Sequence, residues 1–167
     1  MKPKALPHIE RVKELVEYDK DTGAFTWKTY RGGKAKAGTA AGYMAKNGYL
    51  IVCIDHNNCK ASRLAWLLVT GQDPGEMDID HIDGNPSNNA FANLRIATES
   101  QNCTNRKRRS DNKSGYKGVY AMGKKWAAQI TANKKMMYLG VYDTPELAHQ
   151  KYLEQAAIFH GEFGRAA

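Results

Sequence analysis

The sequence predicts a protein of the α+β class: a strand–strand–helix unit followed by a three-stranded antiparallel sheet packed on one helix. Two stretches lead to this prediction. Residues 77–102 read as strand, loop, strand and helix, and residues 114–163 read as three strands and then a helix. Strands joined by short turns pair antiparallel, and the helix that follows them covers one face of their sheet. The N-terminal part adds two helices and several small strands.

The first elements of the chain are predicted from hydrophobic periodicity. Residues 7–18 predict a short amphipathic helix, residues 24–28 alternate like a strand, and residues 31–48, rich in Gly, Ala and Lys, predict a loop with small strands. The apolar positions that recur at helical spacing in the first of these stretches are Ile9, Val12, Leu15 and Val16.

A hairpin and a buried helix are expected next. Residues 49–54 (YLIVCI) give the strongest strand signal in the chain, residues 55–58 predict a turn, and residues 59–62 have the length to pair back. Residues 63–69 (RLAWLLV) predict a buried helix that ends near Gly71.

Turn composition and a helix cap define the strand–loop–strand–helix stretch. A short strand over residues 77–82 leads into the loop 83–89 (DGNPSNN), where Gly, Asn and Pro disfavour any regular element. Residues 93–97 return as a second strand. Thr98 and Gln101 then form a T-x-x-Q capping box, which predicts a helix start near Thr98.

The C-terminal stretch alternates clearly. Strands are predicted over residues 116–121, 125–132 and 135–142, with a tight turn at Asn133-Lys134. A helix is predicted from Pro145 through His160, with Thr144 as its cap and Gly161 as its stop.

Polar residues of the first stretch have a chemical use in common. Asp80 and Asn102 carry hard oxygen ligands suited to one divalent metal ion, Mg²⁺ or Mn²⁺. His81, next to Asp80, has the pKa needed to take a proton from water near neutral pH. A metal beside a phosphate, with a base on the opposite side, is the arrangement that phosphodiester hydrolysis requires.

The sequences DHIDGNPSNN, NLRIAT and SQN, in this order, resemble the HNH, or ββα-metal, endonuclease family, which includes phage and intron homing nucleases. The resemblance implies a ββα-metal fold with Asp80 as a metal ligand, His81 as the general base and Asn102 as the third residue of the metal site. It implies that Asn93 holds the loop and orients His81. In relatives a His usually stands before the sequence RLAW, where this chain has Ser62.

Length, charge and hydropathy limit the class of protein. With 167 residues and a net charge of +8, the chain is long enough for one ordinary or two small domains and is attracted to polyanions. The charge is local: residues 101–140 hold 10 Lys and Arg against 1 Asp, a net of +9. No apolar run approaches the roughly 20 residues of a membrane span, and no signal peptide is recognisable at the N-terminus. We expect a cytoplasmic protein, in the host cell if phage-encoded, with nucleic acid and no membrane as its partner.

The three cysteines, Cys53, Cys59 and Cys103, are expected to be free thiols in a reducing compartment. A zinc site that uses Cys53, His56 and Cys59 is a weaker alternative, because no C-x-x-C pair and no clear fourth ligand accompany it. The basic run Arg106, Lys107, Arg108 and Arg109 is predicted to contact the DNA backbone, with a nuclear localisation signal as the alternative.

The C-terminal sequences GYKGVY, KWAAQI and YLGVYDT resemble the plant APETALA/ethylene-response-factor (ERF) DNA-binding domain. The resemblance implies a three-stranded sheet laid into the DNA major groove, with the helix behind it. The positions expected to contact DNA are Lys117, Gly118, Tyr120, Met122, Lys124, Lys125, Gln129, Thr131, Lys135 and Tyr138. Plant domains place several arginines there, so their base preference is not transferred to this chain.

The sequence thus predicts a sequence-biased endonuclease of phage or homing type that acts on double-stranded DNA as a monomer or homodimer. Residues 1–43 would be an N-terminal extension, residues 44–109 the nuclease domain and residues 110–167 the ERF-like DNA-binding domain. The alternative is a non-catalytic DNA-binding transcription regulator that keeps the HNH part as a scaffold. A structural RNA-binding protein is a more distant third possibility.

Overall fold

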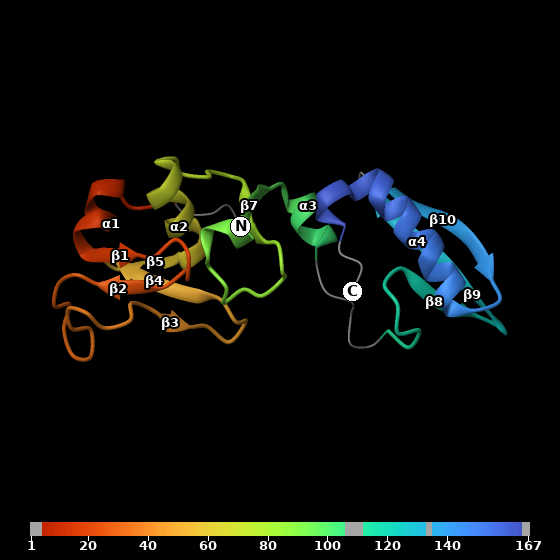
Figure 1. Ribbon diagram of the computed structural model, residues 1–167, viewed down its shortest axis with the longest axis horizontal. Coiled ribbons are helices and arrows are strands. Elements are labelled where there is room, and N and C mark those ends of the chain that lie inside the picture. Colours follow the sequence, from red (N-terminus) through yellow and green to blue (C-terminus); the bar gives the residue numbers. More distant parts are fainter. Residues whose placement is uncertain (1–4, 106–111, 133–134, 165–167) are drawn as a thin grey trace. The chain divides into compact units, whose positions relative to one another are not determined.

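The structure, a computed structural model, describes residues 5–105, 112–132 and 135–164 (Figure 1). The chain divides into two compact units, Met1–Thr98 and Glu99–Ala167. Both units contain helices and antiparallel sheets, so the chain has the mixed α and β composition that the sequence predicts. The division into segments 1–43, 44–109 and 110–167 stays a prediction.

The first unit contains two helices and three small sheets. The sheets pair β1 with β2, β3 with β4 and β5, and β6 with β7. In chain order the elements are α1 (Ile9–Leu15), β1 (Val16–Tyr18), β2 (Phe25–Trp27), β3 (Tyr43–Met44), β4 (Leu50–Ile54), β5 (Asn57–Lys60), α2 (Ala61–Thr70), β6 (Asp78–His81), the 3₁₀ turn η1 (Phe91–Asn93) and β7 (Leu94–Ala97).

The predicted helix over residues 7–18 is wrong at its C-terminal end. Helix α1 stops at Leu15, and Val16 already has extended backbone angles. Val16 pairs with Trp27 and Tyr18 pairs with Phe25, which makes the last three residues of the predicted helix a strand. Pairing with a distant segment overrides the helical periodicity, and Val16 is β-branched, which favours a strand.

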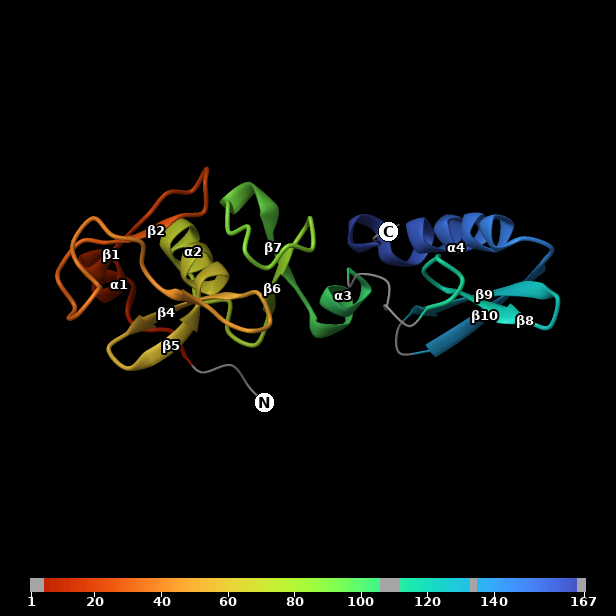
Figure 2. The same cartoon turned by 90° about the horizontal axis from the view of Figure 1, so that it is seen from below.

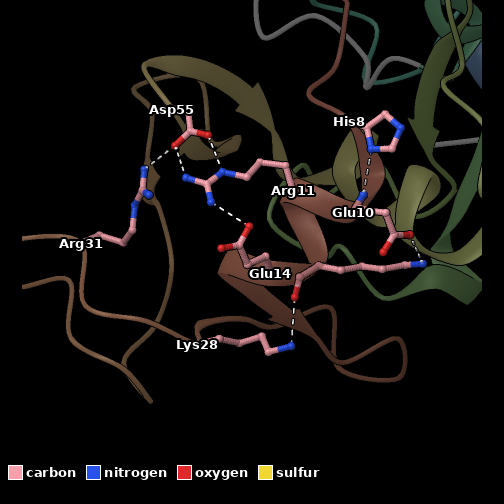
Figure 3. Close-up of polar contacts among 8 residues, drawn as sticks. His8, Glu10, Arg11, Glu14, Lys28, Arg31 and Asp55 are labelled. Carbon is pink, nitrogen blue, oxygen red and sulfur yellow. Dashed lines mark hydrogen bonds and ion pairs between the residues drawn. The ribbon is translucent and has the colours of Figure 1, made fainter.

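Helix α1 is tied to the β4–β5 hairpin by ion pairs around Asp55 (Figure 3). Arg11 donates from Nε to Asp55 Oδ2 over 2.7 Å, and Arg31 donates to Asp55 Oδ1 over 2.9 Å. The two guanidinium groups hold the pKa of Asp55 at about 2. Asp55 and His56 form the hairpin turn with positive φ angles of 44° and 65°, so this contact fastens a turn whose backbone is unfavourable for residues other than glycine.

The core of the first unit joins α1, α2, the β4–β5 hairpin and the β6–β7 hairpin. Ile79 of β6 and Leu94 of β7 are the contributions of the last hairpin. One face of that hairpin is therefore fixed to the hydrophobic core. The main buried apolar residues of this core are Val12, Leu15, Val16, Phe25, Trp27, Val52, Ile54, Leu64, Ala65, Leu67, Ile79 and Leu94.

The second unit contains a short helix, a three-stranded sheet and a long helix. The strand order is β8, β9, β10. The elements are α3 (Glu99–Thr104), β8 (Val119–Met122), β9 (Lys125–Ala132), β10 (Lys135–Tyr142), α4 (Pro145–His160) and the 3₁₀ turn η2 (Gly161–Phe163). The bounds of β9, β10 and α4 agree with the prediction, while the turn predicted at 133–134 lies outside the described residues.

Strand β8 begins three residues later than predicted because of Gly118. This residue has a φ of +73°, and a Cβ atom there would lie 2.2 Å from the ring of Tyr152. The segment before Val119 therefore approaches helix α4 too closely, and in too unusual a backbone conformation, to continue the strand.

Helix α4 covers one face of the β8–β10 sheet (Figure 2). Its small or flat residues Ala148, Tyr152 and Ala156 are buried against the sheet. Such residues allow the helix backbone to lie close to the strands. None of the described helices is long and apolar enough to span a membrane.

Candidate active site

Asp80 and His81 lie side by side at the end of β6 and are both buried, with exposed fractions of 4% and 5%. Strands β6 and β7 lie side by side (Figure 2), and their register sets Asp80 opposite Arg95 and His81 opposite Leu94. Since Ile79 and Leu94 are part of the core, the hairpin holds these two polar side chains in fixed positions.

The carboxylate of Asp80 is paired with the guanidinium of Arg95. Nε and Nη2 of Arg95 lie 2.9 Å and 2.8 Å from Asp80 Oδ2. Burial of a charge without a partner is strongly unfavourable, and this ion pair offsets part of the cost of burying Asp80. Arg95 is absent from the predicted site, because only the register of the hairpin places it opposite Asp80.

The imidazole of His81 is oriented by Asn89. His81 Nε2 lies 3.2 Å from Asn89 Oδ1, and Asn89 Nδ2 donates to the carbonyl of Ser87. Because the second contact uses the amide nitrogen, the amide oxygen must face the imidazole, and Nε2 of His81 must donate the hydrogen. The neutral imidazole therefore carries its lone pair on Nδ1. Asn89 is a site residue that the sequence analysis missed, since only the folded loop brings it to His81.

Burial lowers the pKa of His81 below its ordinary value. The hydrogen bond with Asn89 and the charges of Asp83 and Asp80 act in the opposite direction but do not cancel the effect of burial. The ring of Tyr49 lies edge-on, 5.9 Å from the imidazole centre. His81 is accordingly neutral at physiological pH, which is the form that accepts a proton.

Asn93 closes the loop between β6 and β7. Its Oδ1 accepts from the backbone N–H of Asp83 over 3.0 Å, and its Nδ2 donates to Asp83 Oδ1 and to the carbonyl of Asn88. These contacts connect the two ends of the loop. They are the contacts expected of a residue that holds the loop, and the effect of Asn93 on catalysis stays a prediction.

Residues 18–23, which join β1 and β2, contact the same β6–β7 loop. The hydroxyl of Tyr18 donates to the carbonyl of Asn89 over 2.7 Å, and burial raises the pKa of Tyr18 to about 12. Gly23 has a φ of +77°, and a Cβ atom there would lie 2.3 Å from the backbone of Asn89 and Ala90. Residues 18–23 thus help to fix Asn89, and through it His81.

Asn102 lies on helix α3 of the second unit and is half-buried. The helix begins directly after Thr98, as the capping box predicted. The contribution of Asn102 to a metal site stays a prediction.

The chemistry of the donor atoms fits a hard divalent ion. Mg²⁺ and Mn²⁺ bind proteins through one or two carboxylates and take their other ligands from amide oxygens, water and phosphate. The carboxylate of Asp80 is a donor of this kind, and an amide oxygen from Asn102, which lies in the second unit, stays a prediction. In the described part of the chain no three His, Cys, Asp or Glu side chains gather as a metal cluster, and this includes Cys53, His56 and Cys59 of the zinc alternative.

Strand register separates the residues predicted to contact DNA into two faces. Gln129 pairs with Tyr138 and Thr131 pairs with Met136, so these four side chains lie on the face that α4 leaves open. Lys135 pairs with Ala132, which puts it on the opposite face. The exposed residues Tyr120, Met122, Lys124 and Lys125 belong to the β8–β9 hairpin.

Two of the predicted lysines already have partners. Lys117 donates from Nζ to the carbonyl of Thr104, and Lys125 lies 3.0 Å from Asp143. Lys117 therefore fastens the end of α3 within the second unit. The basic run Arg106, Lys107, Arg108 and Arg109 lies outside the described residues.

Comparison with known proteins identifies the segment that holds this site. The profile of the HNH endonuclease family matches residues 59–103, which include Asp80, His81, Asn93 and Asn102. The chain is similar to protein 3.8 of Escherichia phage T7, with 35% identity over 102 residues, covering 60% of this chain and 84% of that protein.

It is also similar to the uncharacterized HNH endonuclease L560 of Acanthamoeba polyphaga mimivirus, with 34% identity over 122 residues. The match covers 72% of this chain and 63%, less than two thirds, of the mimivirus protein. No solved structure matches the chain at a comparable level of significance. This chain belongs to the same family as protein 3.8 of phage T7, and residues 59–103 are its HNH endonuclease domain.

Proposed function

We propose that the protein is a metal-dependent endonuclease of phage or homing type that hydrolyses phosphodiester bonds of double-stranded DNA. The observation that carries the proposal is the state of His81 within the segment that matches HNH endonucleases. This histidine is buried, its pKa is lowered, and its contact with Asn89 leaves the lone pair on Nδ1.

His81 acts as the general base. Its Nδ1 takes a proton from the water that attacks the scissile phosphorus, the bond from phosphorus to the 3′ oxygen breaks, and the released 3′ oxygen takes a proton from solvent water. The products then carry a 5′-phosphate and a 3′-hydroxyl. Asn89 keeps the imidazole in the required tautomer, and Asn93 holds the loop that carries Asn89.

Asp80 and Asn102 hold the divalent ion in this proposal. A bound Mg²⁺ or Mn²⁺ neutralises charge on the phosphate and on the leaving oxygen. The chain's own contribution is to hold the Asp80 carboxylate against Arg95, at the end of a strand anchored in the core. Preorganised groups of this kind avoid the cost of reorganisation during the reaction.

The second unit supplies affinity and register on DNA. The net charge of +9 over residues 101–140 favours a polyanion through release of counterions. The open face of the β8–β10 sheet carries Tyr120, Gln129, Thr131 and Tyr138, which include donors, acceptors and aromatic rings suited to the edges of bases. The resemblance to the ERF domain supports the same assignment.

The proposal is tested by incubating supercoiled plasmid with the full-length protein and Mg²⁺, Mn²⁺ or EDTA. We expect metal-dependent open circles or linear product, and a loss of about 10²–10⁴-fold in His81→Ala, the usual contribution of a general base. His56→Asn is the matched control, because His56 is exposed and Asn tolerates its positive φ. Intact DNA binding without cleavage under any metal would favour the non-catalytic regulator instead.

A further inference from the structure

We propose that Arg95, which forms an ion pair with Asp80 across the β6–β7 hairpin, competes with the divalent cation for the Asp80 carboxylate. Arg95 is then a positioning residue that orients the Asp80 carboxylate, at the expense of metal affinity. The inference rests on the proposed function, because it concerns Asp80 as a metal ligand. It adds a residue that neither the family match nor the sequence motif assigns to the site.

The geometry directs both guanidinium donors to one oxygen atom. Nε and Nη2 of Arg95 lie 2.9 Å and 2.8 Å from Asp80 Oδ2. Direct cross-strand pairing of Asp80 with Arg95 keeps the two side chains adjacent whenever the hairpin is formed. A cation that approaches Oδ2 therefore meets an oxygen that already accepts charged hydrogen bonds.

Burial makes this competition strong. The side chains of Arg95 and Asp80 are only 12% and 5% exposed, so water and salt screen their attraction weakly. By comparison, the Arg31–Asp55 pair of the same unit is 26% and 45% exposed. Removal of Arg95 withdraws a positive charge from a buried carboxylate, and a divalent cation is the ligand that gains from that change.

The test measures Mn²⁺ binding to the full-length protein without DNA, from the electron paramagnetic resonance signal of free Mn²⁺ at mildly alkaline pH. We expect Arg95→Gln to bind Mn²⁺ with a dissociation constant roughly tenfold lower than the wild type, corresponding to the loss of a charged hydrogen bond. Arg31→Gln, which also removes one arginine and one ion pair, should bind like the wild type. Asp80→Asn should lose the site.

A second readout does not depend on metal binding alone. In EDTA, Arg95→Gln should melt at a lower temperature than the wild type, because it removes a charged hydrogen-bond partner from a buried carboxylate. Added Mn²⁺ should raise its melting temperature by more than it raises that of the wild type, since the tighter ligand stabilises the folded state more. If Arg95→Gln does not fold, Arg95→Lys replaces it and should show a smaller change in the same direction.

The outcomes separate the two proposals. One outcome is that the wild type binds Mn²⁺, Asp80→Asn abolishes the binding, and the Arg95 variants bind Mn²⁺ equally or more weakly. This outcome would overturn the role of Arg95 and leave the proposed metal site intact. If neither the wild type nor the Arg95 variants bind Mn²⁺ in a way that requires Asp80, the proposed metal site is wrong. The proposed role of Arg95 is then wrong as well.

Discussion

The β6–β7 loop of the first unit and the β8–β10 sheet of the second unit differ in where their side chains point. The loop directs its polar side chains inward to bond with itself, whereas the sheet presents large side chains outward. In the loop, Asp83, Asn88, Asn89 and Asn93 bond to one another or to the loop's own backbone, or orient His81. On the sheet, the face opposite α4 presents large side chains outward, with Tyr138 58% exposed and Met136 69% exposed.

This difference suits the loop to hold a catalytic group and the sheet to recognise a partner. A network of mutual hydrogen bonds gives a single geometry, as a general base needs, but one lost contact disturbs the whole loop. An exposed face adapts to a partner, and each side chain contributes a small, separable part of the affinity. We therefore expect large, all-or-none effects in the loop and small, graded effects on the sheet.

Gly23→Ala should produce the largest effect on folding. The new Cβ would lie 2.3 Å from the backbone of Asn89 and Ala90, and the φ of +77° already disfavours alanine. We expect a loss of about 3 kcal/mol in unfolding free energy, measured by urea denaturation, together with lower cleavage. Gly71→Ala is the control, since its φ of +74° is almost the same but no atom lies within 4 Å of its Cβ position. Equal losses in both variants would mean that the turn does not support the loop.

The cysteines should differ in reactivity by about a hundredfold. Burial raises the pKa of the Cys59 thiol from 9.0 to about 11, while Cys53 and Cys103 are exposed. Because the thiolate is the reacting form, an alkylating reagent should modify two thiols quickly and Cys59 about a hundredfold more slowly, as followed by mass spectrometry. In denaturant all three should react alike. Fast modification of Cys59 in the native protein would contradict a closed core in the first unit.

The cleavage rate should follow the protonation of His81. Its pKa lies below the ordinary 6.5, so the rate should be constant above that value and fall about tenfold per pH unit well below the lowered pKa. Folding stability should also decrease as the pH falls from the ordinary pKa of histidine toward the lowered pKa of His81. In this range the unfolded chain binds the proton more readily than the folded chain does. A pH profile at saturating metal tests the first statement, and a midpoint above 6.5 would refute it.

Single changes on the sheet should have the smallest effects. Tyr138→Ala should weaken DNA binding about fivefold with unchanged stability, since the ring is exposed and packs on no core cluster. Lys124→Gln should lower the slope of log affinity against log salt by about 0.9 if this lysine contacts one phosphate. Tyr30→Ala, an exposed tyrosine of the first unit, is the control in a fluorescence anisotropy titration. A hundredfold loss from Tyr138→Ala alone would show that recognition depends on one anchor and is not graded.

Local sequence signals predicted the second unit well. The bounds of β9, β10 and α4 follow from alternation, from the cap at Thr144 and from Gly161, all of which act between near neighbours. The same signals failed at residues 16–18, where pairing with Phe25–Trp27 determines the structure. Prediction from local pattern ends where a partner distant in sequence decides the conformation.

The candidate site shows the same division. Asp80, His81 and Asn93 are predicted as site residues from a motif of fixed spacing, and their roles stay predictions, although Asn93 makes the contacts of a residue that holds the loop. Arg95 and Asn89 were missed, because the hairpin register places the first beside Asp80 and the folded loop brings the second to His81.

The close approach of Gly23 to the β6–β7 loop limits which segment of the chain can be transferred between proteins with its function intact. The segment that matches HNH endonucleases starts at residue 59, yet Tyr18 and Gly23, far outside it, support the residue that orients His81. A recombination event or an engineered chimera that transfers only residues 59–103 would leave this support behind. We therefore expect a chimera to keep the orientation of His81 only if residues 18–23 are transferred together with residues 59–103.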